Sequence, residues 1–264
     1  MRFDIFKYRK FTTILCLAFF LASLVFCVRS LQTVWADFSN GDGVIKGLVV
    51  NGTFEGGTTV GLSGTLHQYG SNIDKVLTTI TDESGRFQFN GIVFQADTIY
   101  RVYVTYKGVL YSLDVNILEN VDSYTGELIV YEPTTDSSVI SVSSASIVFA
   151  KIEKSSQIIW VLELVKIVNS TDRTYAPGPD PMKLLGFGLP PGYQLQNVDT
   201  DLTTFDVLQV DKGFRLTASV PPGEHVVTYD YIFPYIGENF LFKKSFPYGA
   251  NKVRMIVPDH IDAS

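Results

Sequence analysis

Short apolar runs separated by turn residues recur along residues 44–131 of the chain. Between positions 100 and 106, every second side chain points to the same face of an extended chain. One face then carries Tyr100, Val102, Val104 and Tyr106, and the other carries Arg101, Tyr103 and Thr105. Such alternation is typical of a half-buried antiparallel strand. The spacing of the runs predicts an all-β sandwich of about seven strands, at residues 44–50, 60–67, 78–81, 86–89, 99–106, 109–115 and 127–131.

The segment from Thr78 to Phe89 predicts two strands joined by a tight turn. Threonine and isoleucine favour extended backbone before the turn, and Asp82-Glu83-Ser84-Gly85 supplies side-chain hydrogen bonding and a residue that tolerates positive φ. We therefore expect residues 86–89 to run back antiparallel to residues 78–81 as a β-hairpin.

The same turn carries a resemblance to a known family. The pattern Thr81-Asp82-x-x-Gly85-x-Phe87 lies between the runs 45–49 and 100–104, with Gly61-Leu62 also in place. Together these residues resemble the carboxypeptidase regulatory-like domain over residues 43–131. The resemblance implies a transthyretin-like (prealbumin-like) Greek-key sandwich, common in bacterial secreted proteins, that serves as an accessory or binding module and has no catalytic residues of its own.

Length and composition predict a second domain of the same class. The chain has 264 residues and is 46% apolar, which suits two domains of roughly 100–150 residues each. The polar segment 132–138 is the expected linker between a first sandwich at 44–131 and a second, immunoglobulin-like sandwich at 139–258. Residues 37–43 form an expected first linker and residues 259–264 an expected tail. Strands of the second sandwich are expected at 139–152, 158–168, 182–189, 207–210, 213–220, 225–233, 240–245 and 252–257.

The run from Gln157 to Val168 is apolar on both faces and rich in β-branched residues. This composition favours a strand over a helix. A strand that is apolar on both faces is typical of the centre of a covered sheet, so we expect both of its faces to be buried.

The first 36 residues have the three parts of a secretory signal: a basic start, an apolar run from about Phe11 to Val28, and small residues before Asp37. Cleavage after Ala36 would leave a secreted chain that begins at Asp37. The apolar run is about eighteen residues long and nearly spans a bilayer, so an uncleaved membrane anchor is the alternative. In both cases the rest of the chain is expected outside the cell or in its envelope, with membrane contact only through this segment.

Charge limits the expected classes of partner, and cysteine content limits the expected chemistry. The formal net charge is −6, and residues 37–264 hold 16 bases against 26 acids. Such an acidic surface repels phosphate backbones, so nucleic acid is not an expected partner. The two cysteines, Cys16 and Cys27, both lie in the N-terminal run, so the exported part is expected to have no disulfide or thiol chemistry.

The sequence offers little that is typical of a catalytic or metal-binding site. There is no Gly-x-Ser-x-Gly, and the three histidines are scattered, so no catalytic residue and no cofactor is expected. No zinc-ligand spacing occurs in the exported part. Asp199, Asp201 and Asp206 could supply oxygens to calcium, but they lack the turn glycine and closing glutamate of a helical calcium loop. A solvated acidic loop is the preferred interpretation, and no metal is expected.

An aromatic stripe in the second sandwich has two interpretations. Tyr229, Tyr231, Phe233 and Tyr235 alternate, so they share one face of a strand. Aromatic rings fill sandwich interiors, and they also form platforms that bind sugars. We favour the interior, and the ligand-contact role remains the alternative.

These patterns predict an exported, non-catalytic, envelope-associated binding or interaction protein built on β-sandwich modules. The alternative is an accessory subunit or carbohydrate-binding part of an exported peptidase or polysaccharide-degrading system. The expected partner is a protein or polysaccharide at the cell surface, whose identity the sequence does not give.

Overall fold

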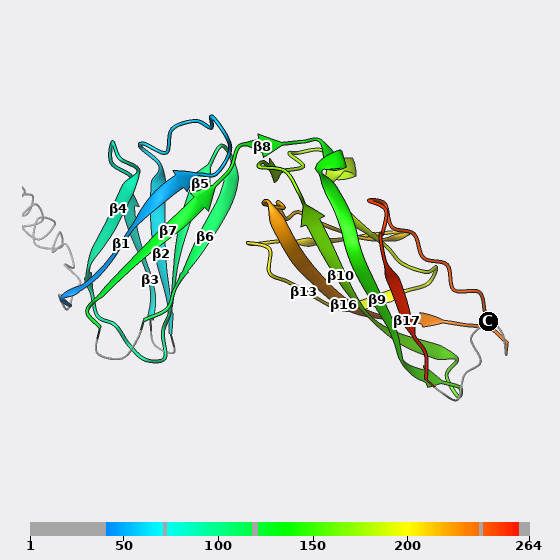
Figure 1. Ribbon diagram of the computed structural model, residues 1–264. Helices are drawn as coiled ribbons and strands as arrows, with labels where there is room; N and C mark the ends of the chain where they lie inside the picture. The colour runs from blue at the N-terminus through cyan, green and yellow to red at the C-terminus, as the bar shows by residue number, and fades with distance from the viewer. Residues whose placement is uncertain (1–40, 71–72, 118–120, 238–239, 259–264) are drawn as a thin grey trace, which may run out of the picture. The chain divides into compact units, whose positions relative to one another are not determined.

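The structure is a computed structural model that describes residues 41–70, 73–117, 121–237 and 240–258 (Figure 1). This part of the chain is all-β, with two short 3₁₀ turns, η1 (Ser137–Val139) and η2 (Pro181–Lys183), and no α-helix. Within these ranges no helix has the length and apolar character needed to cross a bilayer. The predicted signal segment, its cleavage site between Ala36 and Asp37, and the predicted tail 259–264 lie outside the described residues.

The first sandwich consists of a three-stranded sheet, β4-β1-β7, and a four-stranded sheet, β3-β2-β5-β6 (Figure 1). Strand β1 pairs antiparallel with β4 and parallel with β7. Inward side chains of both sheets, among them Ile45, Leu66, Phe89 and Val102, form one core. The strands are β1 (Gly43–Asn51), β2 (Ser63–Gly70), β3 (Ile73–Ile80), β4 (Arg86–Ile92), β5 (Ile99–Tyr106), β6 (Val109–Val115) and β7 (Ser123–Val130).

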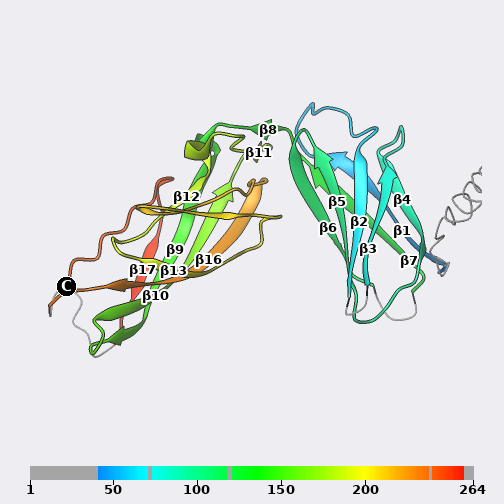
Figure 2. The same ribbon diagram turned by 180° about the vertical axis from the view of Figure 1, so that it is seen from behind.

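The second sandwich packs a five-stranded sheet, β13-β16-β10-β9-β17, against a three-stranded sheet, β12-β15-β14 (Figure 2). A two-residue parallel pair, β8 with β11, adds Tyr175 to its core. The strands are β8 (Pro133–Thr134), β9 (Ile140–Glu153), β10 (Ile158–Asn169), β11 (Thr174–Tyr175), β12 (Leu185–Gly188), β13 (Gln194–Thr200), β14 (Val207–Val210), β15 (Gly213–Leu216), β16 (Gly223–Pro234) and β17 (Val253–Ile256).

The predicted turn at residues 82–85 forms, but the predicted hairpin does not. Asp82 Oδ1 accepts hydrogen bonds from the backbone N–H groups of Ser84 and Arg86, at 2.8 and 2.9 Å, and Gly85 has φ +76°. Strands β3 and β4 nevertheless belong to different sheets, because β4 pairs with β1. The turn therefore carries the chain from one layer of the sandwich to the other.

Gly85 and Gly91 give a matched test of this turn. Both have positive φ, but a Cβ at Gly85 would lie 2.6 Å from Thr59 Oγ1 and 2.8 Å from Val49 O, whereas a Cβ at Gly91 meets nothing within 4 Å. Gly85→Val is expected to cost about 2–3 kcal/mol and Gly91→Val about 1–2 kcal/mol, because only the first adds a clash to the backbone strain. Peptide-resolved hydrogen exchange should show loosening of the first sandwich alone. Equal costs for the two changes would contradict this account of the turn.

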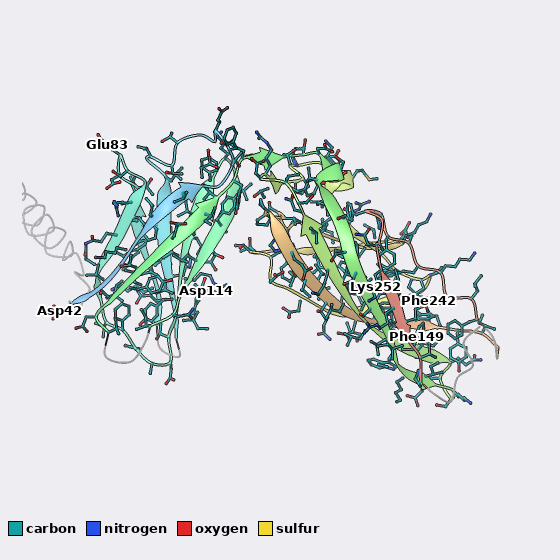
Figure 3. The ribbon with its side chains drawn as sticks, viewed as in Figure 1. Asp42, Glu83, Asp114, Phe149, Phe242 and Lys252 are labelled. Atoms are coloured by element: carbon teal, nitrogen blue, oxygen red, sulfur yellow. The ribbon has the colours of Figure 1, made fainter. Side chains whose placement is uncertain are left out.

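Two segments of the second sandwich differ from the sequence prediction. Strand β13 was not predicted, and the expected strand at 240–245 is an extended segment without a strand partner. Its side chains still cover the core: the ring centroids of Phe242 and Phe149 lie 5.1 Å apart, and Figure 3 shows the two side chains close together. The alternation in this segment therefore reflects the burial of every second side chain, although the backbone pairs with no strand.

The central strand β10 is buried on one face only. Inward residues such as Val161 and Val165 are 1% exposed, but Trp160, Leu162 and Leu164 on the other face are 38–40% exposed. The prediction that both faces are buried is wrong for the described part of the chain. Other described strands flank β10 within its sheet and do not lie over this outer face.

Glu132, in the segment predicted as a linker, is bonded to residues of the first sandwich. Its Oε1 accepts hydrogen bonds from the Tyr106 hydroxyl at 2.6 Å and the Gly57 N–H at 2.8 Å, and its Oε2 lies 2.6 Å from Lys107 Nζ. Bonds from Lys107, Tyr106 and Gly57 hold the pKa of the Glu132 carboxyl at about 2. These bonds depend on the charged carboxylate.

Acidification is therefore expected to destabilise the first sandwich. The pKa of Glu132 is lower in the folded chain than in the unfolded chain, so its stabilisation is complete above about pH 4.5 and is lost as the pH falls toward 2. We expect a loss of about 1–2 kcal/mol from this group, since solvent screens the half-exposed Lys107. Denaturant unfolding at pH 7 and pH 3 measures the difference. Glu132→Gln should reduce the pH dependence by that amount, and an unchanged dependence would rule out this role.

Candidate functional site

The predicted aromatic stripe lies in the interior. Tyr229, Tyr231 and Phe233 on β16 are 1%, 0% and 5% exposed, and Tyr235 is half-buried against Phe240. The alternative interpretation, a sugar-binding platform, does not hold for the first three residues because their ring faces contact other core rings. The hydroxyl groups of Tyr229 and Tyr231 instead take part in a buried polar cluster.

The buried cluster consists of Glu163, Lys244, Tyr229 and Tyr231. Glu163 on β10 is 0% exposed, and its two carboxylate oxygens accept hydrogen bonds from the Tyr229 and Tyr231 hydroxyls, each at 2.7 Å. Lys244 Nζ lies 2.6 Å from Glu163 Oε2 and also donates to Tyr229 Oη at 2.9 Å and to Gly188 O at 2.8 Å. All three ammonium protons and both carboxylate oxygens thus have partners.

Burial sets the protonation of this cluster. Loss of solvation raises the pKa of Tyr229 and of Tyr231, and the Glu163 carboxylate raises both further, so the phenols stay protonated and donate. Burial lowers the pKa of Lys244, while the Glu163 carboxylate opposes that shift. The cluster is a closed ion pair that fastens the irregular segment 240–248 to β10, β16 and the end of β12.

An open groove of about 750 Å³ lies next to this fastened segment. Its walls come from η1, η2, β12, β15 and the segment 245–248. Tyr248 fixes one wall: its hydroxyl accepts a hydrogen bond from the Gly186 N–H at 3.0 Å. The polar lining residues are Asp136, Ser137, Ser138, Lys183, Lys212, Arg215, Ser245 and Tyr248.

Three cations and one carboxylate line the groove. Arg215 is positioned by hydrogen bonds from Nη1 to the carbonyls of Met182 and Leu184, both at 3.1 Å. Lys183 and Lys212 are exposed, and within the described residues neither is ion-paired to a carboxylate. Asp136 caps η1, and its bonds to Ser138 keep the pKa of its carboxyl below the ordinary value. The groove can therefore pair with negatively charged groups on a ligand.

The other candidate residues do not converge. Asp201 accepts a hydrogen bond from the Val226 N–H and lies 3.6 Å from His225 Nδ1, whereas Asp206 lies beside Thr217. Among the described residues, no group of three acidic, histidine or cysteine side chains is arranged to hold a metal ion, and Asp199 is exposed on β13.

Sequence reasoning missed both the cluster and the groove. The one available signal for the cluster was Glu163, a single carboxylate at an inward position of an otherwise apolar run. Lys244 is 81 positions further along the chain, so no spacing rule connects the two residues. The groove residues come from five separate stretches and form no motif.

Comparison with known proteins gives no family. No family model matches the chain, and no curated protein matches it.

Solved structures give weak likenesses at low identity. The major pilin SpaA of Corynebacterium diphtheriae aligns at TM-score 0.24 and 11% identity, covering 75% of this chain and 59% of that one. The T6 backbone pilin of Streptococcus pyogenes aligns at TM-score 0.21 and 10% identity, covering 73% and 54%. A two-domain M1 zinc metallopeptidase aligns at TM-score 0.28 and 8% identity, covering 38% and 22%. The chain spans less than two thirds of each, and these TM-scores carry no argument about function.

Proposed function

We propose that this chain is an exported, non-catalytic binding protein of the cell envelope, and that the groove of its second sandwich holds an acidic polysaccharide. The observation that carries the proposal is a local reversal of charge. Residues 37–264 have ten more acids than bases, yet the groove gathers Lys183, Lys212 and Arg215 against Asp136 alone. A cationic groove in an acidic chain favours a ligand with carboxylate groups.

The shape and lining of the groove support a sugar chain as the ligand. Its volume lies within the range of ligand sites, and the groove opens to solvent. Serine and tyrosine hydroxyls in the same lining suit hydrogen bonding to sugar hydroxyls.

In this proposal the first sandwich is a carboxypeptidase regulatory-like domain, which serves as an accessory module. Each residue of the motif that suggested this family has a structural role. Thr81 is buried and donates to Thr59 O at 2.6 Å, Asp82 closes the turn, Gly85 takes positive φ, and Phe87 is in the core. These roles support the proposed assignment of residues 43–131 to this family.

Reversal of two groove charges tests the proposal. The variant Lys183→Glu, Lys212→Glu is expected to bind polygalacturonate about tenfold more weakly than the unchanged chain, because two attractive pairs become repulsive. The matched control, Lys154→Glu with Lys252→Glu, makes the same change in net charge at exposed positions that do not line the groove. Equal loss in both variants would show that net charge, and not the groove, governs binding.

A further inference from the structure

The outer face of the five-stranded sheet carries a group of apolar residues centred on β10, with Asp230 beside Leu162 and the Lys166–Glu224 ion pair further along the strand. Paired residues on neighbouring strands lie on the same face of a sheet. Leu162 on β10 pairs with Val148 on β9, which pairs with Ile256 on β17, and Trp160 pairs with Ile232 on β16. We define the outer patch as Val148, Trp160, Leu162, Leu164, Ile232 and Ile256.

The outer patch is exposed in the described structure. Trp160, Leu162, Leu164 and Ile256 are 39%, 40%, 38% and 45% exposed. Contiguous exposed apolar patches on soluble domains mark interaction sites, while single exposed apolar residues do not. The composition of β10, apolar on both faces, is that of a strand covered on both sides, which points to a partner over this face.

Exposed charges of opposite sign lie at the two edges of the same sheet. One row of paired residues crosses all five strands: Asp199, Thr228, Leu164, Ser146 and Arg254. It begins with an exposed acid on β13 and ends with an exposed base on β17, and neither is ion-paired within the described residues.

A two-fold axis makes this row complementary to itself. If two copies face each other across an axis parallel to β10, the β17 edge of one lies over the β13 edge of the other. Arg254 of each copy then faces Asp199 of the other copy, so one operation forms two ion pairs. Trp160, Leu162 and Leu164, the apolar outward residues of β10, then lie along the axis and meet their own counterparts, while Lys166 keeps its ion pair with Glu224.

The size of the face fits a stable dimer. Strands β9, β10 and β16 have 14, 12 and 12 residues. At about 3.3 Å per residue and about 4.8 Å between strands, the face measures about 40 by 20 Å. This is on the order of 800 Å² per copy, the area that each partner buries in a typical stable complex.

We propose that the outer patch is the interface of a homodimer, with its two-fold axis along β10. A cross-linking experiment on the full chain tests it in a Cys16→Ser, Cys27→Ser background, where Leu162→Cys is the single thiol. A short bismaleimide is the suitable reagent, because facing sheets lie about 10 Å apart, further than a disulfide spans. Ile80→Cys, on the exposed face of β3, is the control for random collision.

The Leu162→Cys chain is expected to give about tenfold more covalent dimer than the Ile80→Cys chain, which corresponds to about 1.4 kcal/mol. Adding Arg254→Asp or Asp199→Arg alone should lower the yield, because each places like charges opposite each other, and adding both should restore it. Recovery of the dimer yield by the double charge swap is expected only if Arg254 of one copy faces Asp199 of the other, as the proposed axis requires. Equal yields from the two thiols, failure of the double charge swap to restore the dimer, or cross-linking to a different protein would overturn the proposal.

Discussion

Replacing Lys244 with methionine is expected to lower the free energy of unfolding of the second sandwich by about 3–5 kcal/mol, because it leaves the Glu163 carboxylate buried without its counter-charge. The two tyrosine hydroxyls still donate to the carboxylate, but they carry no charge. Denaturant unfolding followed by the fluorescence of Trp160, which lies on β10 at the outer face of the same sheet, measures the change.

Two matched variants separate ion pairing from lost packing. The double variant Lys244→Met, Glu163→Gln should recover most of the loss, since a glutamine can accept from one tyrosine and donate to the other without a buried charge. Lys166→Met removes the base of an ion pair with Glu224 that also joins β10 to β16 but is exposed, and it should cost less than about 1 kcal/mol. A single variant no less stable than the double variant would contradict this account of the cluster.

Tyr231→Ala and Phe233→Ala are each expected to destabilise the second sandwich by about 3–5 kcal/mol, through lost burial and the cavity that remains. Tyr231→Ala also leaves Glu163 Oε1 without its donor. Tyr235→Ala, at the half-buried end of the same stripe, should cost less and serves as the control. The midpoint of urea unfolding gives the comparison, and changes within about 0.5 kcal/mol, as at ordinary surface positions, would be incompatible with an interior stripe.

Alternation in the sequence predicted strands well where each strand has one buried face. Residues 99–106 and 109–115 are predicted with the bounds of β5 and β6, and each of these strands has a buried face. Alternation does not predict β13, because Gln194–Thr200 is a polar edge strand whose side chains are all exposed or half-buried. It also predicted a strand at 240–245, where alternating side chains cover the core although the backbone has no strand partner.

The sequence does not predict which strands pair with each other or which residues form the candidate site. The turn at Asp82 fixes a chain reversal, but the same turn can close a hairpin or connect two sheets, and only the packing of Phe87 and Phe89 in the shared core decides between them. Glu163 and Lys244 meet because segment 240–248 folds back over the sheet. Such contacts depend on tertiary packing and leave no periodic signal.

The proposed ligand of the groove in the second sandwich is an acidic polysaccharide. Hydrogen exchange of the full chain with and without polygalacturonate tests this binding, because protection reports where the polymer lies. We expect slower exchange at residues 181–188, 210–215 and 245–248, and no protection in the Lys183→Glu, Lys212→Glu variant. Protection confined to the first sandwich, or no protection at saturating polymer, would contradict it.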